Sequence, residues 1–367
     1  MNTLSELARY GQSVWLDFIR RSFLVNGELE RLVALGVTGV TSNPTIFQKA
    51  IAESDDYTGA LERLAGGGRS AMDTYEALAV EDIRMAADIL RPVFQATAGM
   101  DGFVSLEVNP HLAHDIKGTV SEALRLFEQV DRPNVMIKVP ATAEGVPALE
   151  RLIADGVNVN ATLVFSLAHY EAVANAYIAG LEKLAESGGD VSRVASVASF
   201  FLSRVDTAVD RALKEAGQSE LLGLAAVTNA GRAYIRFSEI FGTRRWERLA
   251  DRGARVQRPL WASTSTKDPS YPDTKYVDEL IGPQTVNTLP PETLQAFLDH
   301  GRAELALLTG ETEKARLAGI MDRLSAQGID LARITEDLQT EGVAAFAKSF
   351  DALLAAIRKR SAEVAEA

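Results

Sequence analysis

The sequence has no cysteine, which excludes disulfide bonds and thiolate metal sites in its 367 residues. No apolar run is long enough to span a membrane, and the N-terminus lacks the basic and apolar regions of a signal peptide. Basic residues number 38 against 50 acidic ones, which argues against nucleic acid and membrane surfaces as partners. These absences indicate a soluble, cytoplasmic protein, and any anionic metabolite would need a local basic pocket.

Lys138 is the most informative residue that is present. It lies within Asn134-Val-Met-Ile-Lys-Val-Pro140, an apolar run typical of a buried strand. Burial disfavours the charged ammonium form of a lysine, and a partly neutral amine can attack a carbonyl to form a Schiff base. The alternative is a lysine at a strand end that forms an ion pair.

Short β-like runs recur along the chain, and most of them are followed by a segment with helical periodicity. Such alternation predicts a parallel sheet with crossover helices. Eight repeats favour a closed (β/α)8 TIM barrel, and no Gly-x-Gly-x-x-Gly motif supports a dinucleotide-binding fold. The expected strands are residues 13–17, 38–43, 102–107, 135–138, 157–162, 193–199, 258–263 and 284–287.

Helices are expected between these strands and after the last one. Gly36 is a plausible C-cap for the first helix. The long spacings 43–107 and 199–263 predict additional helices, with a loop at Gly66-Gly-Gly68. We expect a single domain over 1–367, in which 290–367 form C-terminal helices packed on the barrel. The segments with the clearest helical periodicity are 24–35, 73–93, 119–127, 144–154, 166–185 and 203–213.

Polar residues stand near the ends of most of the expected strands. In a barrel these ends form one face, where catalytic groups gather. Each residue taken alone is explained as a helix cap or turn residue, whereas one lysine, two carboxylates and several amides or hydroxyls together indicate a site. Asn160 and Thr162 share one face of their strand, because side chains alternate with a period of two. The set comprises Asp17, Asn43, Glu107, Lys138, Asn160, Thr162, Ser199, Ser263 and Asn287.

The sequence resembles the transaldolase family along most of its length. Gly39-Val-Thr-Ser-Asn-Pro-Thr45 is similar to the family's first signature, and Met136-Ile-Lys-Val-Pro140 with Gly145 to its Schiff-base segment. Asn158-Val-Asn-Ala-Thr-Leu-Val-Phe-Ser166 is similar to the strand that follows. The spacing and the Trp261-Ala-Ser-Thr run resemble the longer bacterial subgroup, including forms fused to a phosphoglucose isomerase.

The resemblance implies a role for each matching position. Lys138 would form the Schiff base with a ketose phosphate, and Asp17 would take the proton from the C4 hydroxyl during cleavage. Glu107, with Thr162 and a water, would move protons while the carbinolamine forms and dehydrates. This covalent catalysis needs neither a metal nor an organic cofactor. The hydroxyl groups of the dihydroxyacetone unit would be bound by Asn43, Asn160 and Ser199.

The phosphate site is where the sequence departs from the family. The resemblance implies that Arg204 and Ser263 bind the phosphate, but Ser265 stands where many relatives carry an arginine. Lys267 is the nearest basic residue, and a lysine binds phosphate as a point charge rather than as a fork. The alternative for Lys267 is a solvated loop lysine.

These observations predict a transaldolase that moves a dihydroxyacetone unit from sedoheptulose 7-phosphate to glyceraldehyde 3-phosphate, giving erythrose 4-phosphate and fructose 6-phosphate. One alternative is a Schiff-base fructose-6-phosphate aldolase. Related aldolases tend to have a tyrosine where this chain has Phe201, which cannot donate a proton to the enamine. A second alternative is a non-catalytic sugar-phosphate-binding barrel. We expect sugar phosphates as partners, no nucleic acid, no membrane, and a monomer or homodimer. The pair His111 and His114 lacks further ligands, so no metal is expected.

Overall fold

Eight parallel strands form a closed barrel in the computed structural model, which describes residues 2–65 and 69–366. The strands pair in chain order, and the last pairs with the first. All eight strands expected from the sequence are confirmed, and so is the (β/α)8 architecture. They are β1 (Gln12–Leu16), β2 (Val37–Thr41), β3 (Val104–Glu107), β4 (Val135–Pro140), β5 (Val159–Val164), β6 (Ser196–Phe201), β7 (Arg258–Ala262) and β8 (Thr285–Leu289).

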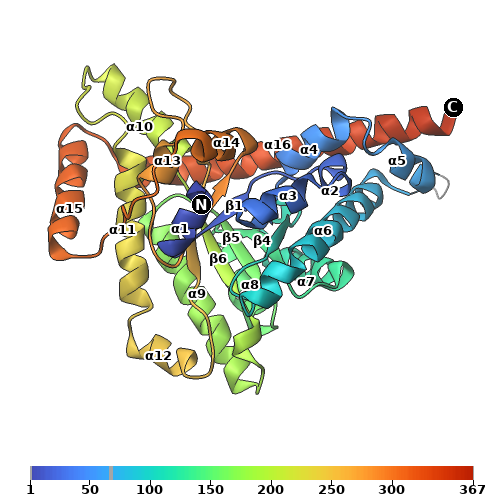
Figure 1. Ribbon diagram of the computed structural model, residues 1–367, viewed down its shortest axis with the longest axis horizontal. Coiled ribbons are helices and arrows are strands. Elements are labelled where there is room, and N and C mark those ends of the chain that lie inside the picture. The colour runs from blue at the N-terminus through green and yellow to red at the C-terminus, as the bar shows by residue number, and fades with distance from the viewer. Residues whose placement is uncertain (1, 66–68, 367) are drawn as a thin grey trace.

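Helices surround the barrel, as Figure 1 shows. The expected extra helices are present in both long spacings, as α4 to α6 and as α10 to α12. The Gly66-Gly-Gly68 loop lies outside the described residues. The helices are α1 (Thr3–Arg9), α2 (Arg21–Val25), α3 (Glu28–Leu35), α4 (Pro44–Ala52), α5 (Thr58–Ala65), α6 (Ala71–Ala96), α7 (Ile116–Val130), α8 (Gly145–Ala154), α9 (Leu167–Glu186), α10 (Ser203–Glu215), α11 (Ala225–Ile240), α12 (Arg244–Ala250), α13 (Lys275–Asp278), α14 (Pro291–His300), α15 (Glu311–Ala326) and α16 (Leu331–Glu366), with 3-10 turns η1 (Pro110–Leu112) and η2 (Val191–Arg193).

The single helix expected at 24–35 is wrong, because the chain forms two helices there. Gly27 adopts φ +79°, a left-handed conformation that breaks the helical path between α2 and α3. Gly36 is confirmed as a C-cap, with φ +117° and its N–H directed at the Leu32 and Val33 carbonyls. The helical periodicity therefore predicted helix correctly on both sides of Gly27, and this one glycine divides the segment into two helices.

The strands are buried on both faces, since helices cover the outside and side chains fill the inside. Every residue of β4 and β5 is buried. Continuous burial of this kind is typical of parallel sheets and explains the near-continuous apolar character of the run before Lys138.

A buried polar network closes the N-terminal end of the barrel. Asp101 accepts hydrogen bonds from Ser13 Oγ and from Trp15 Nε1, the latter at 2.7 Å. Arg258 donates to Ser13 Oγ at 2.8 Å and lies 3.5 Å from the Asp101 carboxylate. Gly39 leaves room for the indole of Trp15, because a Cβ there would lie 2.6 Å from that ring. Side chains therefore fill the inside of the barrel at this end.

The long helix α16 crosses the opposite end of the barrel. In Figure 1 it runs along the upper side in red, with α4 and α5 beside its C-terminal half. Arg360 Nη1 donates to the carbonyls of Ile51 and Ser54, and Thr45 Oγ1 donates to Ser349 Oγ at 2.9 Å. The C-terminal segment thus packs over the strand ends. None of the helices in residues 2–65 and 69–366 has the length and apolar character needed to cross a bilayer.

Candidate active site

Lys138 is buried inside the barrel, with 4% of its surface exposed. Its register partners are Glu107 on β3 and Asn160 on β5. The ammonium nitrogen lies 3.5 Å from Glu107 Oε2 and donates to the carbonyl of Ser42 at 3.0 Å. The amine is thus held between a carboxylate and the segment that follows β2, inside the Gly39–Thr45 motif. Sequence reasoning missed Ser42, because a backbone carbonyl has no residue-type signal.

Two carboxyl groups share the electrostatic field of Lys138. Burial raises the pKa of Glu107 to about 7, the Lys138 charge opposes this rise, and the negative charge of Asp17 adds to it. Burial likewise raises the pKa of Asp17, against the lowering effects of Lys138 and of the hydrogen bond from Thr41 Oγ1 at 2.7 Å. Such raised values suit proton transfer near neutral pH.

A chain of hydrogen bonds links three strands beside the lysine. Ser199 Oγ donates to Asn160 Oδ1 at 2.6 Å, and Asn160 Nδ2 donates to Ser105 Oγ at 3.1 Å. These bonds fix the amide of Asn160 in one orientation. Ser105 was not singled out from the sequence, although it lies on the same face of β3 as Glu107.

Thr162 is fully buried, and its hydroxyl has no hydrogen-bond partner among the described residues. The same holds for Glu107 Oε2, whose 3.5 Å approach to Lys138 is an ion contact rather than a short hydrogen bond. Buried polar atoms are normally satisfied by protein or water. Both groups are therefore available to a reactant or a water at this end of the barrel.

Asn43 has a structural role in addition to its place at the strand end. Its side-chain oxygen accepts from the N–H of Ile46 at 2.9 Å and caps α4. The capping explanation considered for each polar strand-end residue thus applies to Asn43.

Three cationic side chains lie near the rim. The pKa of Lys267 is lowered by burial and by the positive charges of Arg204 and Lys49, so both of these cations are within electrostatic reach of Lys267. None of them forms an ion pair within the part of the chain that the structure describes. Lys267 donates to Ser265 Oγ at 2.6 Å. Lys49 escaped sequence reasoning, because only the fold brings α4 close to the loop after β7.

The Arg204 guanidinium lies over two aromatic rings, 5.5 Å from the centroid of Phe201 and 6.0 Å from that of Phe346 on α16. Burial lowers the pKa of Arg204, and the negative charge of Glu341 opposes this effect. Ser263 adopts φ +56°, and its hydroxyl lies 2.8 Å from Ser203 Oγ. The Ser263 backbone therefore turns sharply beside the start of α10.

The loop that carries Lys267 is anchored on α10. Tyr271 donates to Asp210 at 2.7 Å, and Lys214 pairs with Asp268 at 2.9 Å. The Asp268 carboxylate also accepts from the backbone and hydroxyl of Ser270. These bonds reduce the freedom of the segment next to Lys267.

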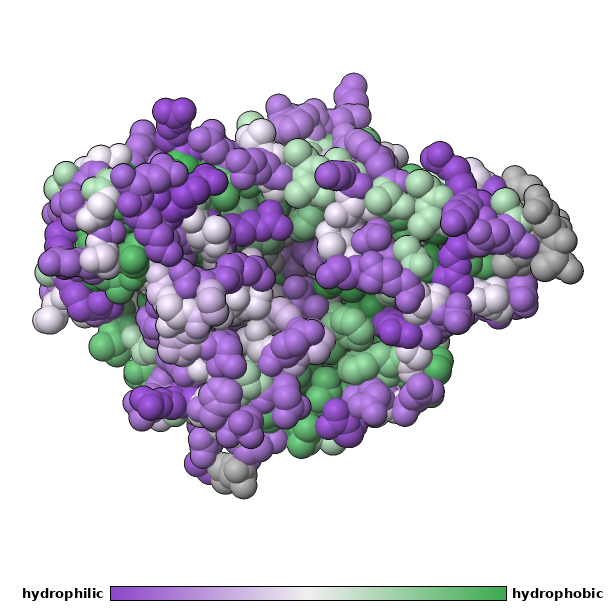
Figure 2. Space-filling model, turned by 90° about the horizontal axis from the view of Figure 1, so that it is seen from above, coloured by the Kyte–Doolittle hydropathy of each residue, from purple (hydrophilic) through white to green (hydrophobic). Residues whose placement is uncertain are grey.

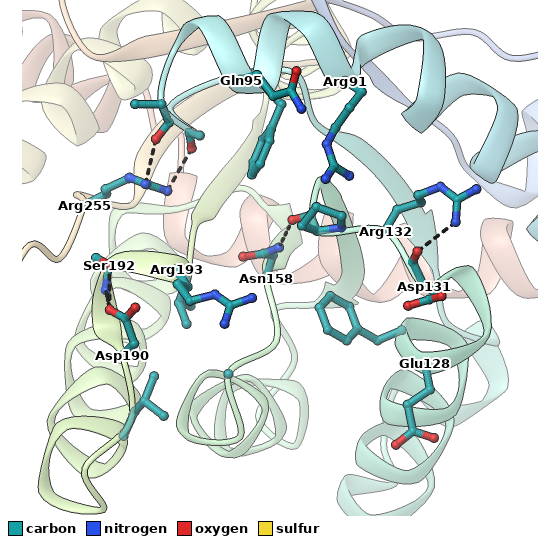
Figure 3. A pocket seen from close by; sticks show the side chains of 18 residues that line it. Arg91, Gln95, Glu128, Asp131, Arg132, Asn158, Asp190, Ser192, Arg193 and Arg255 are labelled. Carbon is teal, nitrogen blue, oxygen red and sulfur yellow. Dashed lines mark hydrogen bonds between the residues drawn. The ribbon is translucent and has the colours of Figure 1, made fainter.

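Seen from above in Figure 2, mainly hydrophilic side chains surround a depression near the centre of the molecule. A separate hollow of about 930 Å³ lies at the N-terminal end of the barrel. There Arg91 and Arg193 point into the hollow, whereas Arg255 donates to the carbonyls that follow α6 (Figure 3). Cations are favourable here because the helix C-termini, with their partial negative charge, gather at this end.

The fold and the strand-end site define a (β/α)8 barrel with a buried lysine and two carboxyl groups, the class to which Schiff-base aldolases and transferases belong. Residues 14–357 match the family described as Transaldolase/Fructose-6-phosphate aldolase. The chain belongs to that family.

Curated relatives cover almost the whole chain. A protein from Thermobifida fusca named Transaldolase is 50% identical over 355 residues, 96% of each chain. A Transaldolase from Frankia alni is 50% identical over 363 residues, covering 98% of this chain and 97% of its own. A Transaldolase from Mycolicibacterium smegmatis is 46% identical over 358 residues, covering 96% and 95%.

Proposed function

We propose that this protein is a transaldolase that carries a dihydroxyacetone unit on Lys138, from sedoheptulose 7-phosphate to glyceraldehyde 3-phosphate. The observation that carries the proposal is the buried amine, held 3.5 Å from Glu107 at the carboxyl end of the barrel. Relatives named Transaldolase, about 50% identical over nearly the full length, support it.

The reaction begins when the amine of Lys138 adds to the ketone carbon of the donor. Glu107, acting with Thr162 through a water, delivers the proton that lets the carbinolamine lose water and become an iminium. The pKa of about 7 supports this role, because the carboxyl group can both give and take a proton near neutral pH.

Cleavage then needs a base at the neighbouring hydroxyl. Asp17 removes the C4 hydroxyl proton, the C3–C4 bond breaks, and its electron pair moves into the iminium to leave an enamine on Lys138. The aldehyde product departs, and the enamine adds to the acceptor aldehyde with the proton returning from Asp17. The iminium serves as the electron sink.

We assign neutral side chains to the dihydroxyacetone end of the substrate and mainly cationic side chains to its phosphate end. The hydroxyls of the dihydroxyacetone unit contact Asn43, Asn160 and Ser199. For the phosphate we assign Arg204, Ser263 and Lys267, with Lys49 adding positive charge. The proximity of three cations without ion-pair partners in the described residues supports this assignment.

The transferase is favoured over the fructose-6-phosphate aldolase. Phe201 is buried, packs against Phe165 with ring centroids 5.1 Å apart and planes tilted by 42°, and lies beneath Arg204. The Phe201 side chain has no proton to donate to the enamine. The enamine therefore persists until it reacts with an acceptor aldehyde. Cleavage of fructose 6-phosphate that needs no acceptor would favour the aldolase. The non-catalytic binding barrel has no use for Lys138, Glu107 and Asp17 together.

We further propose that the chain forms one domain, with α14 to α16 as part of it, and that it works in the cytoplasm as a monomer or homodimer. The contacts of α16 with α4, α5, α10 and β5 support the single domain.

The test is borohydride reduction of the protein incubated with fructose 6-phosphate, followed by peptide mass mapping. We expect a dihydroxyacetone-sized adduct on Lys138, and none in Lys138→Ala, which should remain folded but inactive. A folded wild-type protein that gives no adduct while the substrate stays intact would favour the binding barrel.

A further inference from the structure

Gln339 on α16 connects the C-terminal helix to the two strands at the centre of the site. It is 9% exposed, and its amide nitrogen donates to the carbonyl of Ala141 at 2.9 Å and to that of Leu163 at 3.0 Å. Ala141 follows β4, which carries Lys138, and Leu163 lies in β5 directly after Thr162. Two carbonyl acceptors identify the bonding atom as nitrogen, since the amide oxygen has no proton to donate.

Leu163 needs support from outside its own strand. It adopts φ +58°, a left-handed conformation that is disfavoured for leucine. The pairing of β5 with β6 shifts register between Ala161 and Val164, so the strand bulges at this point. A bulge at a barrel rim re-aims the neighbouring side chain. The orientation of Thr162 therefore depends on how the Leu163 peptide is held.

The rest of α16 packs around the same point. A Cβ on Gly342 would lie 2.9 Å from Leu163 Cδ2, so glycine allows the helix to touch this leucine. His169 Nε2 bonds Glu336 at 2.7 Å, and its Nδ1 faces the N–H of Phe165 at 3.4 Å. Helix α16 thus contacts Leu163 of β5 on one side of Gln339 and His169 of α9 on the other.

We propose that Gln339 is a positioning residue of the reaction, whose amide ties the ends of β4 and β5 together and so fixes Thr162 relative to Lys138. This inference rests on the proposed function. It assigns to the C-terminal helix a part in the Schiff-base step, although Gln339 itself does not touch the substrate.

The test is the variant Gln339→Met, which keeps the length of the side chain and removes both donors. We expect kcat to fall by about tenfold to a hundredfold, since small misplacements of reacting groups have effects of this size. KM for the ketose phosphate should change little, because the binding groups are untouched. The rate at which the borohydride-trapped adduct forms on Lys138 should fall by the same factor as kcat.

Thr340→Ala is the matched control, because Thr340 is exposed on the next position of α16 and bonds only within the helix. It should leave kcat and the trapping rate unchanged. A purely structural role of Gln339 would lower the melting temperature of Gln339→Met while kcat at 25 °C stays within twofold of wild type, and that result would overturn the inference.

Gln339→Ala gives a second measurement should Gln339→Met not fold, because it removes the same two hydrogen bonds without placing an apolar chain in their space. We again expect a fall in kcat with a smaller change in KM. Unchanged kcat in folded Gln339→Ala would count against the inference. Failure of wild type to form the adduct would instead refute the proposed function, so the two failures are distinguishable.

Discussion

Replacing Glu107 with glutamine should change how the stability of the protein depends on pH. Glu107 is 7% exposed, and burial raises the pKa of its carboxyl group from 4.5 to about 7. The folded protein thus holds this proton more tightly than the unfolded chain does. The stability that the proton contributes is fully present below pH 4.5 and is lost as the pH rises through 7.

The size of the effect follows from the two pKa values. One pKa unit corresponds to about 1.4 kcal/mol, so the loss amounts to about 3 kcal/mol between pH 4.5 and pH 8. Glutamine has no proton to lose in this range. The stability of Glu107→Gln relative to wild type should therefore be about 3 kcal/mol more favourable at pH 8 than at pH 4.5.

Urea unfolding followed by circular dichroism at the two pH values measures this difference. Glu304→Gln, at an exposed position, serves as the control and should show the same pH dependence as wild type. In addition, kcat of Glu107→Gln should fall by about a hundredfold or more, as for loss of a general acid–base group. A stability difference between Glu107→Gln and wild type that is equal at both pH values would refute the burial argument.

Three further predictions concern the rim and the closed end of the barrel. Lys267→Ala should raise KM for phosphorylated donors, with kcat at saturation nearly unchanged. Added salt should weaken donor binding less in the variant than in wild type. Equal KM values for the variant and wild type would indicate that Lys267 is a solvated loop lysine. Arg258→Met should lower the free energy of unfolding by about 3 kcal/mol, because one partner of a buried ion pair is removed, while steady-state kinetics remain unchanged. Gly145→Ala should prevent correct folding, since its Cβ would lie 1.8 Å from the Pro140 carbonyl oxygen; a wild-type melting temperature would contradict this.

Much of the fold could be predicted because its signals are local. Each strand is a short apolar run with a nearby polar residue, and this pattern can be recognised without knowing what the strand packs against. The break at Gly27 was missed because a helical period continues across it, and only the left-handed φ ends α2 and restarts α3. The crossing of α16 over the strand ends could not be deduced, since its polar, alanine-rich sequence fits either a barrel wall or a cover.

The candidate site divides in the same way. Residue type and position at strand ends were enough to nominate Lys138, Glu107 and Asn160. In the barrel, Lys138 is the register partner of both Glu107 and Asn160. Lys49 and Gln339 carried no such signal, because each lies on a helix with an ordinary sequence.

By itself the sequence determined the barrel and the chemistry at its strand ends, because a period of two and a strand terminus are properties of a few consecutive residues. Tertiary structure alone decided which distant groups complete the site. The carbonyl of Ser42 meets the amine of Lys138 across 96 positions, and the amide of Gln339 meets the carbonyl of Leu163 across 176. Contacts over such separations depend on how whole helices pack, and no local pattern records them.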